Sequence, residues 1–282
     1  GLLGLEVDLL LKQKRLDPDL ARAHSSFLLG ASLCEEWDSP VLMSILGIIN
    51  WYWNVDKTAR ARARPLFIMT QSGNYVRPTP RPPSVECLRV VRSFAALFAA
   101  NPWVRIPAPF TPVRNCVVAW TDASTKAAGW VHERLNDCIP PSERTFSLPR
   151  ELDNIFEYEA WALIVLLKRV CQLAPNQSFQ LYCDNKPLTQ AIYRGWSENS
   201  FVNTVVGIWH LLHRSFSINV RWISTDDNKA DKPSRPPFPP PRSSSQPWRS
   251  LSTHWIISRE GSKQGPAFPS KWLAVLDGES RH

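Results

Sequence analysis

The sequence predicts an α/β fold in which a five-stranded sheet is flanked by helices. Three observations support this prediction. Short apolar runs typical of strands recur along the chain, over residues 115–120, 129–131, 146–148, 179–183 and 218–223. Between them, apolar residues recur at helical spacing. Acidic residues then stand at or near the ends of these segments, in four separate short motifs.

The first three strands are expected in close succession. Residues 115–120 form an apolar run typical of a buried strand, and Asp122 lies just past its end. A turn over residues 124–128 leads to the second strand at 129–131, and residues 146–148 form the third. The sequence therefore places Asp122 where the first strand meets a turn.

A long helix is expected to follow from Ile155, where the period of the pattern changes. Its apolar stripe consists of Leu163, Leu166, Leu167, Val170 and Cys171. This 3.6-residue spacing is that of a helix with one buried face. Glu159 would lie near the start of this helix, on the turn before the stripe.

One strand and two helices are expected next, from the spacing of apolar residues and the positions of proline and glycine. Residues 179–183 form a fourth strand, with Asp184 at its C-terminal end. Pro187 begins a short helix that Gly195 ends, because proline suits the first turn of a helix and glycine its end. Residues 201–216 are expected to form an amphipathic helix.

The last strand, residues 218–223, alternates apolar and polar residues. Asp231 follows in a short acidic turn or helix that Pro233 is expected to stop. Carboxylates at the ends of neighbouring strands, with one on an adjacent helix, converge at one edge of such a sheet. A phosphodiester can be cut there by two divalent ions roughly 3.5–4 Å apart, and Mg²⁺ prefers oxygen ligands.

The four acidic motifs resemble those of the ribonuclease H domain of retroelement reverse transcriptases. They are Thr-Asp-Ala-Ser followed by Gly-Trp, Glu-Ala-Trp-Ala-Leu, Tyr-Cys-Asp-Asn and Asn-Lys-Ala-Asp-Lys-Pro-Ser-Arg. The last is similar to the closing motif of the DIRS-like, Pao-like and hepadnaviral branches. The resemblance implies a mixed ribonuclease H-like sheet and cleavage of RNA within an RNA–DNA hybrid. It also implies that Asp122, Glu159, Asp184 and Asp231 bind two Mg²⁺ or Mn²⁺ ions.

The N-terminal part carries the same resemblance. Residues 2–8 resemble the end of a reverse-transcriptase palm, and residues 46–53 and 63–71 resemble the thumb and connection of retroelements. No Tyr-x-Asp-Asp-type motif is present, so the chain should not polymerise. We expect the C-terminal fragment of a retrotransposon reverse transcriptase, with the upstream polymerase domain as a candidate partner. The stretch 224–227 also lacks the histidine that many ribonucleases H carry there.

Four regions are expected. Residues 1–72 are a mostly helical palm-end and thumb-like part, and residues 73–113 are a proline-rich connection with a helix over 88–98. The ribonuclease H-like domain covers 114–236. Residues 237–282 form a tail rich in proline, serine and arginine that is expected to be disordered.

Several acidic residues compete with the predicted ligands. Glu157 could replace Glu159, although the spacing to the apolar stripe favours Glu159. Asp226 and Asp227 compete with Asp231, but they lie where a turn is expected, and aspartate favours turns. Asp122 itself could cap a turn. The amides of Asn185 and Asn228 could orient the site or serve as turn residues.

The charge of the chain suits a polyanionic partner. The 282 residues include 33 Lys and Arg and carry a net charge of +8, and the hydrophobic fraction of 44% is enough for a core. Arg60, Arg62 and Arg64 alternate in the best local basic run, either on a strand edge or on a solvated face. Together with Lys126, in the turn after Asp122, they are the candidate nucleic-acid contacts.

The cellular context is expected to be intracellular, in the nucleus or cytoplasm. The six cysteines are widely spread without a Cys-x-x-Cys motif, which favours a reduced protein. Neither a signal peptide nor an apolar run long enough to span a membrane is visible, so no membrane partner is expected.

Two other functions remain open at this point. The chain could be a catalytically inert, nucleic-acid-binding remnant of the same polyprotein, keeping the fold and the basic surface. It could also be another nuclease or a transposase-type protein of the same fold class. Cleavage that is selective for the hybrid distinguishes ribonuclease H from the second alternative, which would prefer DNA.

Overall fold

The computed structural model describes residues 4–71, 80–106, 116–133, 141–173, 178–213 and 216–242. Most of the predicted tail, from residue 243 onward, lies outside the described residues. The chain forms two compact units, Gly1–Ile106 and Pro107–His282. Within the described ranges, no helix combines the length and the apolar character needed to cross a bilayer.

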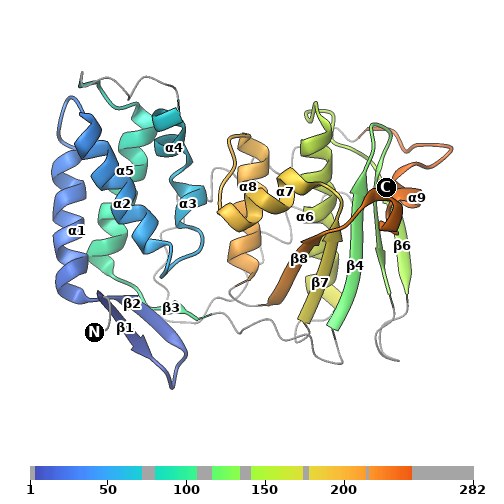
Figure 1. Cartoon of the computed structure of the whole chain (residues 1–282), viewed down its shortest axis with the longest axis horizontal. Coiled ribbons are helices and arrows are strands. Elements are labelled where there is room, and N and C mark those ends of the chain that lie inside the picture. Colours follow the sequence, from blue (N-terminus) through green and yellow to red (C-terminus); the bar gives the residue numbers. More distant parts are fainter. Residues whose placement is uncertain are drawn as a thin grey trace. The chain divides into compact units, whose positions relative to one another are not determined.

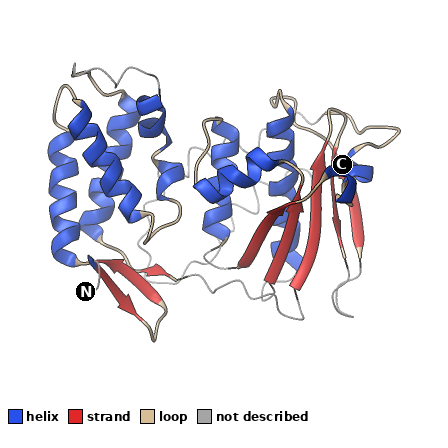
Figure 2. Ribbon diagram, in the orientation of Figure 1, coloured by secondary structure: helices blue, strands red, loops and turns tan. Residues whose placement is uncertain are grey.

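The first unit is mostly helical, as expected, and also contains a small antiparallel sheet (Figure 2). The strands of this sheet, in spatial order, are β1 (Leu5–Asp8), β2 (Gln13–Leu16) and β3 (Val104–Arg105). The helices are α1 (Pro18–Ala31), α2 (Ser39–Tyr52), α3 (Ala59–Arg62), α4 (Arg64–Gln71) and α5 (Val85–Ala100).

The helix expected over residues 88–98 belongs to the core of this first unit. It is α5, which begins after Ser84, whose hydroxyl accepts a hydrogen bond from the backbone N–H of Cys87. Phe94 and Phe98 are buried on its inner face, and both rings lie edge-on to the ring of Tyr52 in α2. Residues 80–106 of the expected connection therefore pack in the same unit as the thumb-like segment.

The second unit is built on a mixed five-stranded sheet, which confirms the predicted ribonuclease H-like fold. In spatial order its strands are β6 (Ser142–Phe146), β5 (Ala128–His132), β4 (Cys116–Ala123), β7 (Ser178–Cys183) and β8 (Ser217–Trp222). The first three are antiparallel to their neighbours, whereas β7 pairs in parallel with both β4 and β8. The C-terminal ends of β4, β7 and β8 therefore lie at one edge of the sheet.

Helices cover both faces of this sheet. They are α6 (Ile155–Leu173), α7 (Lys186–Arg194), α8 (Ser200–Leu212), the short 3-10 helix η2 (Thr225–Asp227) and α9 (Asp231–Ser234). Figure 1 shows α6, α7 and α8 on one side of the sheet and α9 on the other. The side chains along β5 support this arrangement, because successive residues of a strand point to opposite faces of the sheet. Ala128 and Trp130 belong to the main core, whereas Gly129 between them faces α9.

Several element boundaries differ from the sequence prediction, four of them in ways that matter here. The strand β4 continues through Asp122 instead of ending before it. The third strand lies earlier, because β6 is a largely polar edge strand without an apolar signal. Helix α8 ends at Leu212, before residue 216. Pro233 lies inside α9 and does not stop it, since proline in a first turn removes only an N–H that would have no helical partner.

Candidate active site

The structure gathers the four predicted carboxylates at the edge where β4 and β7 end. Asp122 lies in β4, Glu159 in the second turn of α6, Asp184 directly after β7 and Asp231 at the first position of α9. Asp122 and Glu159 are buried, with 2% and 5% of their surface exposed, and the other two are half-buried. Segments that are far apart in the sequence thus bring four acidic side chains into one small region.

Asp122 lies at the centre of this group. The pKa of its carboxyl is raised to about 7, chiefly by burial and further by the charges of Asp184 and Asp231, against an opposing hydrogen bond from Ser234. A like charge nearby disfavours ionisation, so Asp184 and Asp231 both favour the protonated form of Asp122.

The pKa of Glu159 is shifted further than that of Asp122. Burial is the main reason that its pKa rises to about 10, and repulsion from Asp122 and Asp184 adds to the shift. Without a cation nearby, Glu159 therefore keeps its proton at neutral pH. A bound cation would reverse this preference, because opposite charge favours the ionised carboxylate.

A thiol borders the carboxylates. One ligand atom each of Glu159, Cys183 and Asp184 lie within 4.8 Å of one another. Burial, followed by the charge of Glu159, raises the pKa of the Cys183 thiol well above its usual value. Most of the donors gathered here are carboxylate oxygens, which hard cations such as Mg²⁺ and Mn²⁺ prefer to a thiol.

Asp184 has a free oxygen suited to such a cation. Its Oδ2 accepts a hydrogen bond from Thr225 Oγ1 at 3.0 Å. Its Oδ1 is shielded from solvent and accepts no hydrogen bond from the described residues. A buried carboxylate oxygen without a donor is costly unless a cation compensates it, so the residues present fit a divalent ion.

Helix α9 is fixed to the sheet by hydroxyl groups and by one glycine. Ser124 Oγ donates to the carbonyl of Ser234 at 2.6 Å, and Thr145 Oγ1 donates to the carbonyl of Pro233 at 2.7 Å. A Cβ atom at Gly129 would lie 2.8 Å from backbone atoms of both α9 residues, so only glycine allows this approach. These contacts hold Asp231 beside the other carboxylates.

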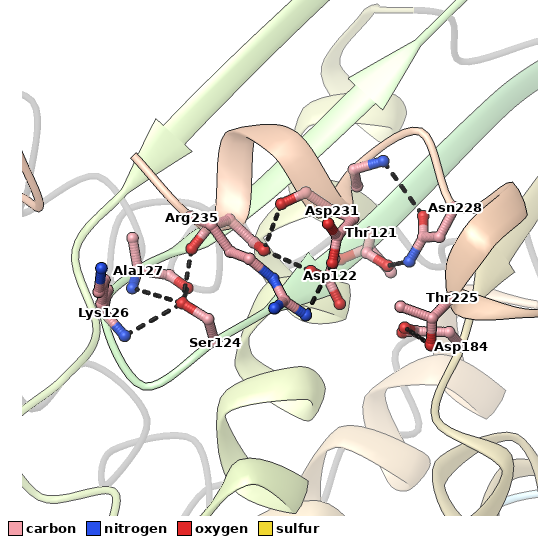
Figure 3. Close-up of polar contacts among 12 residues, drawn as sticks. Thr121, Asp122, Ser124, Lys126, Ala127, Asp184, Thr225, Asn228, Asp231 and Arg235 are labelled. Carbon is pink, nitrogen blue, oxygen red and sulfur yellow. Dashed lines mark hydrogen bonds and ion pairs between the residues drawn. The ribbon is translucent and has the colours of Figure 1, made fainter. Parts of the chain in front are cut away.

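Ser234, the last residue of α9, and Arg235, which follows it, contact the carboxylates directly. Figure 3 shows Arg235 beside Asp231. Ser234 Oγ lies within hydrogen-bonding distance of Asp122 Oδ2 and 2.8 Å from the carbonyl of Asp231, and its single proton can go to only one of them. Arg235 forms an ion pair with Asp231, with 2.8 Å between Nη2 and Oδ1. Neither residue was expected to have a role in the site, although both stand in the closing Asn-Lys-Ala-Asp-Lys-Pro-Ser-Arg motif.

The two amides considered from the sequence have separate positions. Asn228 is buried, and its Nδ2 donates to the carbonyl of Thr121 in β4 at 3.1 Å, which fixes the loop before α9 (Figure 3). Asn185 caps α7, because its Oδ1 accepts from the backbone N–H of Leu188 at 2.8 Å.

The competing acidic residues have other partners. Glu157 accepts hydrogen bonds from the backbone N–H of Asp153 at 3.0 Å and from Asn199 Nδ2 at 2.7 Å. Asp227 accepts a hydrogen bond from the hydroxyl of Ser224 in the exposed turn. Asp226 is exposed in the same 3-10 helix. These contacts give Glu157 and Asp227 structural roles outside the carboxylate group.

The predicted basic contacts are divided between the two units. Arg60 donates to Asn50 Oδ1 and lies over the ring of Trp53, and Arg62 donates to Ser93 Oγ. Their alternation is not that of a strand, because Arg60 and Arg62 lie in α3 and Arg64 begins α4.

Lys126 belongs to the second unit. It is exposed in the turn between β4 and β5, and its backbone N–H donates to Ser124 Oγ at 3.1 Å. Of the four predicted basic residues, Lys126 is therefore the one that shares a compact unit with the carboxylates.

No protein-family model matches the chain, and no curated protein matches it. Among solved structures, ribonuclease H1 from Halobacterium salinarum is 16% identical with a TM-score of 0.32, covering 41% of this chain and 90% of that chain. The N-terminal ribonuclease H domain of a Mycobacterium tuberculosis protein is 16% identical with a TM-score of 0.31, covering 41% and 88%. A foamy viral protease–reverse transcriptase in complex with an RNA/DNA hybrid is 13% identical with a TM-score of 0.30, covering 85% of this chain. The chain spans 32% of the length of that viral protein.

Proposed function

We propose that this chain is a ribonuclease H-type endonuclease that hydrolyses RNA within RNA–DNA hybrids, using two divalent metal ions. We further propose that it is the C-terminal fragment of a retrotransposon reverse transcriptase. The observation that carries the proposal is the convergence of Asp122, Glu159, Asp184 and Asp231 on one end of the sheet.

The electrostatics of the site support metal binding more than a structural role. A purely structural carboxylate is normally paired with a cation or held by several donors. Here Asp122 and Glu159 are buried and repelled by their neighbours, and Asp184 Oδ1 accepts no hydrogen bond from any described residue. Such an arrangement opposes folding unless a ligand of opposite charge stabilises it.

The four carboxylates would hold the metal ions between them. Bound divalent cations supply an activated water and stabilise the leaving 3′ oxygen. Asp122, Glu159, Asp184 and Asp231 are the residues that would hold these ions. Thr225 holds one oxygen of Asp184, which leaves the other available to a cation. Ser124 and Thr145 keep α9, and with it Asp231, in place.

Basic side chains would supply the sequence-independent part of binding. Lys126 is exposed on the unit that carries the carboxylates, and we propose that it contacts a phosphate of the hybrid. Arg60, Arg62 and Arg64 would contact nucleic acid from the other unit, together with the polymerase domain of the same element. Discrimination of RNA from DNA would depend on contacts to the 2′-hydroxyl groups.

A cleavage assay with the full chain tests this function. A labelled RNA–DNA hybrid is incubated with Mg²⁺ or Mn²⁺, beside a DNA duplex of the same sequence and an Asp184→Asn variant. We expect cleavage of the RNA strand only, and no cleavage by the variant. The Glu157→Gln variant serves as a control, because it alters a neighbouring carboxylate with other partners.

The other outcomes separate the alternatives. Cleavage of the DNA duplex at a similar rate would favour another nuclease of the same fold class. Salt-sensitive binding of the hybrid without cleavage would favour the inert nucleic-acid-binding remnant. Cleavage that survives Asp184→Asn would show that the activity arises elsewhere.

A further inference from the structure

One large aromatic side chain is exposed directly beside the carboxylates. Trp222 is the last residue of β8, and 51% of its surface is exposed. In the sheet it is paired with Cys183, which precedes Asp184, and its indole Nε1 donates to the carbonyl of Asp184 at 3.0 Å. This hydrogen bond fixes the ring at the rim of the acidic site, with one part of the aromatic surface left open to solvent.

A cation lies next to this ring. Lys186 is the first residue of α7, its side chain is exposed, and its Nζ lies 6.0 Å from the centre of the Trp222 ring. That distance is at the outer limit of a cation–π contact, so the ring holds the ammonium group only weakly. The ammonium group therefore remains available to an anion that approaches the carboxylates.

An exposed indole and an ammonium group at this position suit a nucleic-acid strand. A phosphodiester that reaches the metal ions brings its neighbouring sugar and the next phosphate over the rim of the site. An indole offers a flat apolar surface for a sugar or an unpaired base, and lysine pairs with phosphate. Trp222 and Lys186, which we call the rim pair, provide both contacts next to Asp184, Trp222 through its hydrogen bond and Lys186 two residues along the chain.

We propose that the rim pair binds the substrate strand on one side of the cleaved phosphate, Trp222 through its open face and Lys186 through the adjacent phosphate. The proposal rests on the proposed hybrid substrate and assigns it two contacts outside the metal ligands. Trp222 thus has two functions, since its Nε1 also positions Asp184, and the two can be separated by substitution.

Hybrid binding by the full chain tests the rim pair. Fluorescence anisotropy with a labelled hybrid and Mg²⁺ is measured in an Asp122→Asn background, so that the hybrid stays intact. Trp222→Phe removes the Nε1 donor and keeps an aromatic face, whereas Trp222→Leu removes both. Phe238→Leu is the matched control, because Phe238 is an aromatic residue that is 90% exposed on the same unit and belongs to none of the helices and strands that carry the carboxylates.

We expect Trp222→Leu to weaken binding by about 5- to 30-fold, in the range of one lost aromatic contact to a nucleotide. Trp222→Phe should retain most of the affinity, and Phe238→Leu all of it. Lys186→Gln should weaken binding and reduce the slope of log K against log salt by about 1, as for one lost phosphate contact.

Equal loss of affinity in Trp222→Phe and Trp222→Leu would overturn the proposal, because the hydrogen bond to Asp184 would then account for the whole effect. Unchanged affinity in Trp222→Leu, or an unchanged salt slope in Lys186→Gln, would also overturn it. Binding that depends on Trp222 and Lys186 while the unsubstituted chain cleaves nothing would support the rim pair and contradict the proposed nuclease. The two proposals can therefore fail separately.

Discussion

Gly129 and Ser234 approach so closely that a Cβ atom on the glycine would lie 2.8 Å from the backbone nitrogen of the serine. Gly129 is paired with Asp122 in the sheet, and Ser234 contacts the same aspartate through its hydroxyl. The missing side chain at position 129 thus lets α9 rest on the sheet directly over the residue at the centre of the site. The packing of a short helix and the position of a carboxylate, Asp231, depend on one glycine.

Gly129→Ala should displace α9 and weaken metal binding. The added methyl group meets backbone atoms, which cannot move aside as a side chain could, and overpacking of this kind costs about 1–3 kcal/mol. Urea denaturation measures the loss of stability, and calorimetric titration with Mg²⁺ measures the affinity. Both should decrease.

Gly47→Ala is the control for this substitution. Gly47 lies within α2, and a Cβ atom there would meet nothing within 4 Å. Alanine in a helix interior should stabilise the protein by roughly 0.5–1 kcal/mol without affecting metal affinity. If Gly129→Ala were equally harmless, α9 would not depend on close contact with the sheet.

Glu159→Gln should stabilise the metal-free protein at high pH. The folded-state pKa of Glu159 is about 10, above its ordinary value of 4.5. The folded state therefore binds a proton that the unfolded chain releases, and stability falls as the pH rises from about 4.5 through about 10. Glutamine is neutral at every pH, so this loss should disappear, with a rise in Tm of about 2–4 °C for each kcal/mol recovered.

Thermal denaturation in EDTA at pH 5 and pH 8 measures this effect. The Tm of Glu159→Gln should be higher than that of the unsubstituted protein at pH 8, and the two values should differ little at pH 5. Addition of Mg²⁺ should raise the Tm of the unsubstituted protein and raise that of the variant much less. Glu157→Gln, which loses hydrogen-bonding partners instead of repulsion, should show no gain at pH 8. A gain in both variants would indicate a general charge effect.

The sequence predicted the sheet and the acidic positions because both depend on local signals. Strands β4, β7 and β8 are apolar or alternating, and Asp184 follows one of them directly. The polar edge strand β6 has no such signal, and its position was predicted wrongly. The contacts of Ser234 and Thr145 could not be predicted, because each joins segments about ninety residues or more apart. Such contacts depend on how α9 returns to the sheet.

Asn228→Ala should separate the last loop from β4. Asn228 is buried, with its Nδ2 bonded to the carbonyl of Thr121 and its Oδ1 to the N–H of Ala230. Loss of both bonds leaves buried backbone groups without partners, which costs about 1–3 kcal/mol each. Stability and Mg²⁺ affinity should both decrease, since Asp231 follows this loop.

Asn219→Ala is the matched control for Asn228→Ala. Asn219 donates to Gln180 Oε1 at 2.8 Å on the same sheet, away from the carboxylates. Its loss should cost about 0.5–1.5 kcal/mol and leave Mg²⁺ affinity unchanged. A decrease in affinity in both variants would mean that metal binding follows overall stability, and not the position of Asp231.

Arg235→Gln should tighten the binding of Mg²⁺. Arg235 is paired with Asp231, so a metal ion that uses this carboxylate must compete with the guanidinium group. Because the pair is partly exposed, the gain should be small, on the order of 1 kcal/mol or about fivefold at low salt, and should decline as salt increases. Arg242→Gln removes the same charge from the same unit at a site where the guanidinium contacts Tyr158, and should have little effect. Weaker Mg²⁺ binding in Arg235→Gln would contradict this expectation. It would mean that Arg235 helps the metal ion by orienting the Asp231 carboxylate, and that this effect outweighs the competition between the two positive charges.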